Sequence, residues 1–477
     1  MILPLSFVES VRQLLGHSTA EAFLAALEQE PSTSIRLNPL KQPQEMQLPI
    51  EAVPWSTHGY YLTERPRFTF DPLLHAGAYY VQEASSMFVE QAVRTHVHGA
   101  VCALDLCAAP GGKSTLLRSC LPEGSLLVAN EYVRSRANIL AENLTKWGHP
   151  DVVVTQTDAA TLGELTNAFD LILADVPCSG EGMFRKDAEA VDEWSEEAVA
   201  ACVVRQRRIL TDVWPALKPG GILIYSTCTY NTNENESNVG WACQELGAEA
   251  LPIPTAEGWQ VGGGLPEGEK RPVYRFLPHR TRGEGFFLAV LRKQGGEEEV
   301  ANVLSAERER PKKTKKSGRE SLFTIAQRAE VETWLQPQEL VNRTMVEHDE
   351  GLHLLPTAHL DLCQALARRC HVMLYGTRLA TLKGRDLQPA HALALSATLL
   401  HPDALPTASL SYEQAIAYLG REALTLPAST ARGWVRLCFR GLSLGWGKQL
   451  GTRTNNLYPQ EWRIRSTHRP EAEERVI

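Results

Sequence analysis

The stretch VCALDLCAAPGGKST, residues 101–115, decides the fold of the chain. It opens as an apolar run that ends at Leu106, breaks into small residues and glycines, and continues from Lys113 as a segment compatible with a helix. This order predicts a strand, a tight turn and a helix. In an open α/β sheet such a turn lies at the carboxyl edge of the strands, where ligands bind. Glycines there let a ligand approach the backbone, and the start of the helix offers free N–H groups.

The residues of the turn restrict the kind of ligand. A phosphate-binding loop would need a glycine five residues before Gly112, and Cys107 stands there. The spaced glycines of a dinucleotide site are also missing, because Gly111 and Gly112 are adjacent. With Asp105 inside the strand, the turn suits a cationic amino-acid cofactor such as S-adenosylmethionine, which carries an ammonium and a sulfonium. A purely structural turn is the alternative, and this stretch alone does not decide between them.

Downstream of the turn, strand-like runs alternate with helical segments. The predicted elements are strands at 125–130, 151–155, 169–175 and 222–227, helices at 133–147 and 195–217, and a closing antiparallel hairpin at 273–277 and 285–291. Residues 169–175 (FDLILAD) are almost continuously apolar, which is typical of a parallel strand buried on both faces. The fold class is therefore α/β, with a largely parallel sheet in the middle of the chain.

The segment before this domain has a different pattern. Apolar residues in 7–27 recur with helical spacing and are interrupted once, which predicts two short helices. Residues 34–41 (SIRLNPLK) are strand-like, and we expect Arg36 and Lys41 to be exposed to a partner; a solvated strand face is the alternative. A further helix is expected to run to about Thr95.

Composition limits the functional classes. A chain of 477 residues has room for two to four domains. Its net charge of -8 gives no global basic field, so RNA binding would depend on local patches. None of the ten cysteines forms a Cys-x-x-Cys pair, so no metal is expected. The first residues lack a signal-peptide pattern and no apolar run would span a bilayer, so we expect a cytoplasmic protein without a membrane partner.

The second half of the chain begins with residues 295–320, which have the charged composition of a linker. Beyond them the pattern predicts a small β unit near 374–385, a helix at 411–419, and a compact β barrel. This barrel is locally basic, with aromatic residues between the arginines, which is typical of an RNA-binding appendage; a solvated barrel rim is the alternative. The predicted domains are an N-terminal RNA-side domain (1–95), the α/β domain (96–294), the linker (295–320), a first C-terminal domain (321–400) and the barrel (401–477).

Three chemically active side chains follow adjacent predicted strands. Asp175 ends one strand, Cys178 follows in a polar turn, and Cys228 stands at the end of the next strand. We expect all three to face the crevice of the glycine turn. A cysteine in such a turn is more reactive than a buried one. Each residue alone is more often structural, but two thiols and a carboxylate beside a cofactor turn are a rarer pattern.

These groups suit methylation at carbon 5 of a pyrimidine. A thiolate that adds to carbon 6 makes carbon 5 able to accept a methyl group from a sulfonium. A carboxyl group hydrogen-bonded to the ring stabilises the developing charge, and a base then removes the carbon-5 proton. The target base has to be flipped out or single-stranded.

Several motifs resemble one enzyme family. DLCAAPGGKST (105–115), DVPCSGEGMFRKD (175–187) and STCTYNTNENE (226–236) are similar to signatures of the NOL1/NOP2/Sun family of RNA cytosine-5 methyltransferases. SIRLNPLK and QEASSM (82–87) resemble its upstream motifs. The tail resembles the bacterial 16S rRNA methyltransferase F subgroup through RLATLKGRDLQPAHALAL (378–395) and GLSLGWGKQL (441–450). The resemblance implies a Rossmann-like S-adenosylmethionine-dependent methyltransferase domain, a small N-terminal domain and a C-terminal PUA-like β-barrel domain that binds RNA.

The resemblance also implies cofactor contacts. The methionine part of S-adenosyl-L-methionine would be held by Cys107, Ala108, Ala109, Pro110, Gly111, Gly112 and Lys113. Glu131, at the tip of the second strand, would take the ribose, and Asp158 would lie near the adenine. Arg136, on the following helix, is counted with the cofactor residues, and Asp175 would close the site and contact the target cytosine.

For the chemistry, the resemblance makes Cys228 of the Thr-Cys motif the nucleophile and gives Cys178 of the Pro-Cys motif the task of breaking the covalent intermediate. Only the resemblance orders the two, because DNA cytosine methyltransferases use their Pro-Cys residue as nucleophile. Arg36, Asn38 and Lys186 are expected on the RNA side.

The expected activity is formation of 5-methylcytidine in 16S rRNA by a monomer, through a covalent bond between a cysteine and carbon 6. A tRNA cytosine-5 methyltransferase is one alternative, and a catalytically silent, RNA-binding ribosome assembly factor is another. A DNA methyltransferase fits least, given the tail and the Thr-Cys motif.

Overall fold

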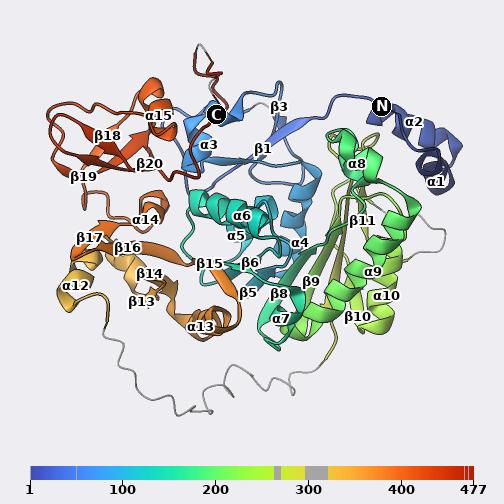
Figure 1. Cartoon of the computed structure of the whole chain (residues 1–477). Coiled ribbons are helices and arrows are strands. Elements are labelled where there is room, and N and C mark those ends of the chain that lie inside the picture. The colour runs from blue at the N-terminus through green and yellow to red at the C-terminus, as the bar shows by residue number, and fades with distance from the viewer. Residues whose placement is uncertain (1, 50, 263–269, 296–320, 467, 471) are drawn as a thin grey trace.

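The computed structural model describes residues 2–49, 51–262, 270–295, 321–466, 468–470 and 472–477 (Figure 1). The predicted linker, apart from its first residue, lies outside the described residues. Within them, no helix combines the length and the apolar character that a membrane crossing requires.

A nine-stranded sheet forms the centre of the molecule (Figure 1), in the order β10-β12-β9-β8-β5-β6-β7-β15, with β11 paired to β12. Its strands are β5 (Cys102–Asp105), β6 (Leu126–Asn130), β7 (Val152–Gln156), β8 (Phe169–Asp175), β9 (Leu217–Thr227), β10 (Ala248–Leu251), β11 (Tyr274–Phe276), β12 (Phe286–Lys293) and β15 (His371–Tyr375). The five strands from β9 to β7 run parallel, whereas β12 and β15 add to the two sides of this group antiparallel.

Helices cover both faces of this sheet because its strands are apolar on both sides. One layer consists of α4 (Val89–His96), α5 (Gly112–Cys120) and α6 (Arg134–Trp147). The other consists of α7 (Ala159–Gly163), α9 (Glu196–Val213), α10 (Glu236–Glu245) and α13 (Leu360–Arg369). The carboxyl ends of β5, β8 and β9 therefore stand side by side at one edge, which the two layers leave free.

The N-terminal segment forms α1 (Leu5–Leu15), α2 (His17–Leu27), α3 (Pro72–Ala76) and a sheet ordered β2-β3-β1-β4. Its strands are β1 (Thr33–Leu37), β2 (Glu51–Ala52), β3 (Gly59–Leu62) and β4 (Tyr79–Val81). The helices α1 and α2 pack on α8 (Ala188–Glu193) and on the loops that carry the two cysteines. This places N-terminal residues on both flanks of the crevice.

The C-terminal part contains two four-stranded sheets. The first, β13-β14-β16-β17, comprises β13 (Arg343–His348), β14 (Gly351–Pro356), β16 (Thr377–Lys383) and β17 (Asp386–Pro389), accompanied by α12 (Ile325–Thr333) and α14 (His391–Leu395). The second, β18-β19-β20-β21, comprises β18 (Thr407–Ser409), β19 (Gly433–Phe439), β20 (Leu442–Gln449) and β21 (Thr454–Asn456), with α15 (Tyr412–Leu419) beside it. This second unit shares one apolar core with the N-terminal sheet, and the two lie next to each other in Figure 1.

Most predicted elements of the α/β region are present, with one rearrangement. We expected residues 374–385 to form one small β unit. Instead, β15 leaves that unit and pairs with β7, so residues 371–375 extend the central sheet. The short strand β10, which has the sequence AEAL, was not predicted.

Candidate active site

The turn after β5 has the geometry that close ligand approach requires. Gly111 has a φ of +113°, which favours glycine, and α5 begins at the next residue. Asp105 is buried below the turn, where it accepts a 2.6 Å hydrogen bond from Ser114. Burial raises the pKa of Asp105 to about 7. Its other oxygen, Oδ1, has no hydrogen-bond partner among the described residues, so a buried acceptor next to the turn is left unpaired.

The predicted ribose residue stands at the edge of the same turn. Glu131 directly follows β6, and its carboxylate accepts a 2.9 Å hydrogen bond from the backbone N–H of Val133. Arg136 lies 3.5 Å from this carboxylate and donates a 3.0 Å hydrogen bond to the carbonyl of Ala109. Arg136 thus ties the acid to the turn. Asp158 is exposed at the end of the next strand, where it caps α7 through the N–H of Thr161, at 2.7 Å.

A lysine and an acid join the turn to β8. Lys113 Nζ lies 2.8 Å from Asp175 Oδ2, and Ser226 donates a 2.7 Å hydrogen bond to Asp175 Oδ1. Burial lowers the pKa of Lys113, but the charge and the hydrogen bond of Asp175, together with other nearby acidic groups, outweigh burial, so the pKa is raised and the lysine stays protonated. Asp175 is held by both partners and keeps part of its surface free. This fits a residue that contacts both cofactor and target.

The two cysteines meet in the crevice. Cys178 Sγ and Cys228 Sγ lie 3.3 Å apart, and both are reduced and partly exposed. Their hydrogen bond, together with burial, raises the pKa of Cys178 well above that of an ordinary thiol. Cys178 therefore keeps its proton and can donate it to the sulfur of Cys228. The side-by-side arrangement predicted from adjacent parallel strands is what the structure has.

Two buried glutamates, which the sequence reasoning did not single out, hold the cysteine loops together. Glu181 accepts hydrogen bonds from the backbone N–H groups of Tyr230 and Asn231, at 2.7 and 3.0 Å. Glu234 accepts one from the N–H of Ser179, at 3.0 Å. Each acid lies in one motif and binds the backbone of the other. Their position inside the two cysteine motifs, 175–187 and 226–236, is the feature of the sequence that could have indicated this role.

The predicted RNA contacts on β1 are wrong. Arg36 and Asn38 are only 1% and 2% exposed, and Lys41 is also buried. Arg36 donates to Gln82 and Thr115, while Asn38 donates to two backbone carbonyls. These side chains pack the N-terminal sheet against the central domain, so none of them is accessible to a partner.

Other residues expected on the RNA side divide in two. Lys186 is exposed beside the cysteine loop, 3.5 Å from Glu284. In the barrel, two of the aromatic residues that stand between the arginines, Trp446 and Tyr458, are buried in apolar cores. They are therefore not free to stack on bases.

Comparison with known proteins extends these observations. Three family models match: "16S rRNA methyltransferase RsmB/F" at residues 96–292, "N-terminal domain of 16S rRNA methyltransferase RsmF" at 3–84, and "Methyltransferase RsmF PUA domain" at 406–464. Ribosomal RNA small subunit methyltransferase F of Aliivibrio salmonicida is 31% identical, over 97% of this chain and 98% of its own.

Solved structures agree on the central fold. A methyltransferase homolog protein from Pyrococcus horikoshii is 29% identical with a TM-score of 0.51, covering 60% of this chain and 94% of its own. NSun6 from the same organism, solved with SFG, has a TM-score of 0.52 at 22% identity, over 61% of this chain and 99% of its own. The likeness to NSun6 concerns the fold alone.

The resemblance drawn from the motifs is thereby confirmed, and so are the Rossmann-like domain, the small N-terminal domain and the PUA domain. The cofactor is S-adenosyl-L-methionine, and the orphaned Asp105 oxygen and the glycine turn suit its cationic end. The chain belongs to the ribosomal RNA small subunit methyltransferase F family, within the S-adenosylmethionine-dependent methyltransferases.

Proposed function

We propose that the chain methylates carbon 5 of a cytidine in 16S rRNA, with Cys228 as nucleophile and Cys178 as the residue that helps to release the product. The observation that carries this proposal is the 3.3 Å contact between the two sulfur atoms; the raised pKa of Cys178 favours its protonated form in that contact. A thiol that donates a hydrogen bond to its neighbour favours the thiolate form of that neighbour. This supports Cys228 as the nucleophile, in agreement with the resemblance of its Thr-Cys motif.

The reaction balances with these groups. The Cys228 thiolate forms a bond to carbon 6, and the electron pair displaced from the ring double bond makes carbon 5 nucleophilic. S-Adenosylmethionine, when bound, supplies the methyl group on a sulfonium. A base then takes the carbon-5 proton, and the electron pair of that carbon–hydrogen bond restores the ring double bond and expels the Cys228 thiolate. Cys178 lies beside the carbon–sulfur bond that breaks, which supports its place in this last step.

Asp175 and Lys113 would act on the ring and the cofactor. A carboxyl group that accepts a hydrogen bond from the exocyclic amine of cytosine and shares a proton with N3 stabilises the charge that builds up during attack. The ion pair with Lys113 and the bond from Ser226 fix Asp175 in one orientation. Cys107 is not a competing nucleophile, because burial raises its pKa and keeps it protonated. Its place is in the cofactor turn, with residues 108–113, Glu131, Arg136 and Asp158.

An adduct assay tests the order of the two cysteines. Cys178→Ala should trap a protein–RNA adduct that survives a denaturing gel, whereas Cys228→Ala should form none. Cys202→Ala, which changes a cysteine on α9, is the matched control and should turn over without accumulating adduct. An adduct from Cys228→Ala but not from Cys178→Ala would reverse the assignment.

The substrate is tested separately. The names of the relatives support the small-subunit rRNA, and the PUA domain supports RNA binding by residues 401–477. Methyl transfer is compared on 30S particles, naked 16S rRNA and tRNA, with bisulfite sequencing to locate the product. Turnover on tRNA alone would replace rRNA as the substrate, and cofactor and RNA binding without turnover would indicate an assembly factor. We further propose that the protein acts as a monomer in the cytoplasm.

A further inference from the structure

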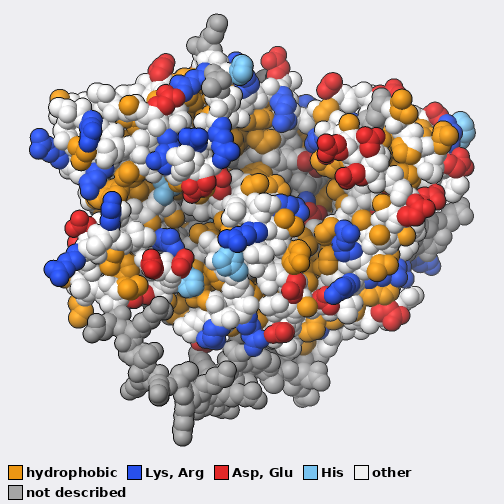
Figure 2. All heavy atoms as spheres, in the orientation of Figure 1, with side chains coloured by type: hydrophobic (Ala, Val, Ile, Leu, Met, Phe, Trp, Pro, Cys, Tyr) orange, Lys and Arg blue, Asp and Glu red, His pale blue; other side chains and the backbone are white. Residues whose placement is uncertain are grey.

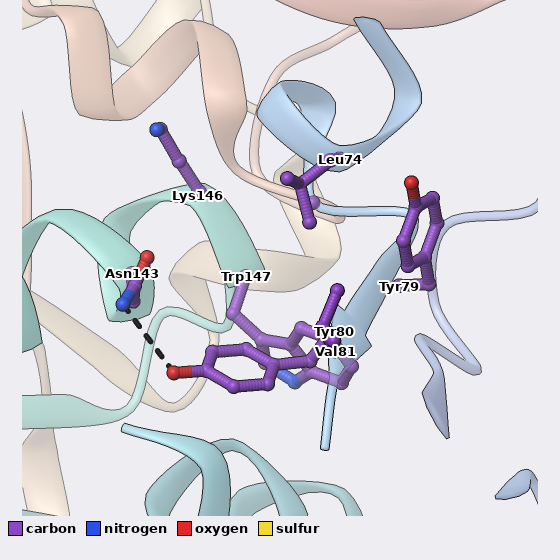
Figure 3. A pocket seen from close by; sticks show the side chains of 8 residues that line it. Leu74, Tyr79, Tyr80, Val81, Asn143, Lys146 and Trp147 are labelled. Atoms are coloured by element: carbon purple, nitrogen blue, oxygen red, sulfur yellow. Dashed lines mark hydrogen bonds between the residues drawn. The ribbon is translucent and has the colours of Figure 1, made fainter. Parts of the chain in front are cut away.

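A cavity of about 210 Å³ lies behind the cofactor turn, between the N-terminal sheet and α6. Figure 3 shows its lining, to which the N-terminal segment contributes Leu74, Gly77, Tyr79, Tyr80 and Val81, and α6 contributes Asn143, Lys146 and Trp147. It is far larger than the roughly 30 Å³ share of one water molecule. It is also smaller than the cavities of about 300 Å³ and more that take drug-sized ligands. The volume therefore suits a single planar ring system.

The walls combine aromatic rings with a polar edge. In Figure 3 the ring of Tyr80 lies across the cavity with its hydroxyl toward Asn143, and Leu74 projects toward that ring. The Asn143 amide lies 3.4 Å from this hydroxyl and donates a 2.8 Å hydrogen bond to the carbonyl of Pro110. The same helix side chain thus touches both the cavity and the cofactor turn.

A buried cation lies against the cavity wall. The guanidinium of Arg36 sits 4.6 Å from the centre of the Trp147 ring. Its partners, Gln82 and Thr115, are neutral, and no carboxylate lies within ion-pair distance among the described residues. Burial lowers the pKa of Arg36 to about 10, so it remains charged at neutral pH. The guanidinium therefore packs on the Trp147 ring and fixes the orientation of this wall of the cavity.

The geometry points to a base-binding subsite: we propose that this cavity receives one unpaired nucleobase of the RNA substrate. An aromatic wall can stack on any base, and the amide and hydroxyl of the polar edge can pair with its ring atoms. The inference rests on the proposed RNA substrate. A base seated here would lie one side chain away from the cofactor turn, so the subsite would help to place the RNA relative to the site of methyl transfer.

Filling the cavity tests the proposal. Leu74→Trp places an indole in the space for the base, and Leu48→Trp makes the same change at an exposed leucine of the N-terminal segment. Leu74→Trp should weaken RNA binding about tenfold, equivalent to about 1.4 kcal/mol. This is within what one stacked base contributes. Leu48→Trp should bind RNA as the wild type does, and both variants should bind S-adenosylmethionine with the affinity of the wild type. Equal RNA affinity of the two folded variants would overturn the proposal.

A second measurement needs no variant. Wild-type protein is irradiated with RNA that carries 4-thiouridine, and the cross-linked peptides are identified by mass spectrometry. Cross-links to residues 74–81 or 143–147 are expected, and their absence from both would also overturn the proposal. Methyl transfer by the wild type is recorded in parallel. If the wild type methylates rRNA but these tests fail, only the subsite is rejected; if it methylates no RNA, the proposed function fails first.

Discussion

Glu234→Gln tests whether the buried acids position the cysteine loops. One carboxylate oxygen of Glu234 accepts from Ser179 N–H and Gln206 Nε2, at 3.0 and 2.7 Å, and the other accepts from Asn231 Nδ2 at 2.8 Å. All three partners are donors. A glutamine amide must turn its own N–H₂ toward at least one of them, so at least one charge-assisted hydrogen bond is lost and two donors face each other. A hydrogen bond to a charged group contributes about 1.5–3 kcal/mol.

We therefore expect Glu234→Gln to lower the free energy of unfolding by about 2 kcal/mol. For a domain of about 200 residues this corresponds to a melting temperature lower by about 4–8 °C. Because Ser179 adjoins Cys178, product release should also slow, and the protein–RNA adduct should accumulate as in Cys178→Ala. Thermal unfolding and the adduct gel measure the two effects.

The matched control is Glu245→Gln, at an exposed position at the end of α10. It should stay within about 0.5 kcal/mol of the wild type, as surface substitutions usually do. The reasoning is refuted if Glu234→Gln melts and turns over like this control. If Glu234→Gln lowers stability without affecting turnover or adduct level, Glu234 supports the fold but does not position Cys178.

Iodoacetamide should label Cys178 slowly at pH 8, because the raised pKa of this thiol leaves little thiolate. In Cys228→Ala the hydrogen bond that contributes most to the raised pKa is gone, so mass spectrometry should find faster labelling of Cys178. Equal labelling rates in the wild type and the variant would contradict a raised pKa caused by Cys228. Hydrogen peroxide should join Cys178 and Cys228 in a disulfide, as each thiol gives up one hydrogen and the peroxide becomes two waters. Turnover should then fall and return with a thiol reductant, whereas irreversible loss without that cross-link in a peptide map would speak against it. Arg36→Met removes a buried, hydrogen-bonded cation and should lower the free energy of unfolding by about 2 kcal/mol or more. Arg134→Met, at an exposed position, should change the melting temperature little. Similar melting temperatures of the two variants would mean that Arg36 is not the packing residue described above. Glu131→Gln should weaken S-adenosylmethionine binding about tenfold, or about 1.4 kcal/mol, by calorimetry, and unchanged affinity would remove Glu131 from the ribose site.

The central domain was predictable because its signals are local. Strand β8 is an almost unbroken apolar run. The long helix α9 was also predicted, although it ends at Val213 and the glycine pair expected to stop it lies inside β9. The meeting of Cys178 and Cys228 also followed, since residues after adjacent parallel strands share one edge. Strand β15 was assigned to the wrong sheet because its partner β7 lies more than 200 residues earlier, and no local pattern encodes that pairing.

Arg36 shows where composition misleads. An arginine on a short strand beside polar residues is usually exposed, because burying a charge is costly unless hydrogen bonds compensate. Here the compensation comes from Gln82 and from Thr115 of α5, far away in the sequence. Neither acceptor could be linked to Arg36 from one sequence. The charge that suggested contact with RNA instead fixes α5 against the N-terminal sheet.

The spacing of the two thiols is best understood as a result of paired carboxylates. Glu181, from the loop of Cys178, binds the backbone just beyond Cys228, and Glu234, from the segment after Cys228, binds the backbone just beyond Cys178. A third acid, Glu236, forms a buried ion pair with Arg275, which in turn donates to the carbonyl of Tyr230. A single hydrogen bond would leave each loop free to pivot, whereas reciprocal bonds fix both loops at once. Because buried acceptors without donors are costly, either loop can move only if it breaks the bonds of the other. The motifs around the cysteines are thus acidic for a structural reason: their buried carboxylates hold the thiol contact on which the proposed chemistry depends.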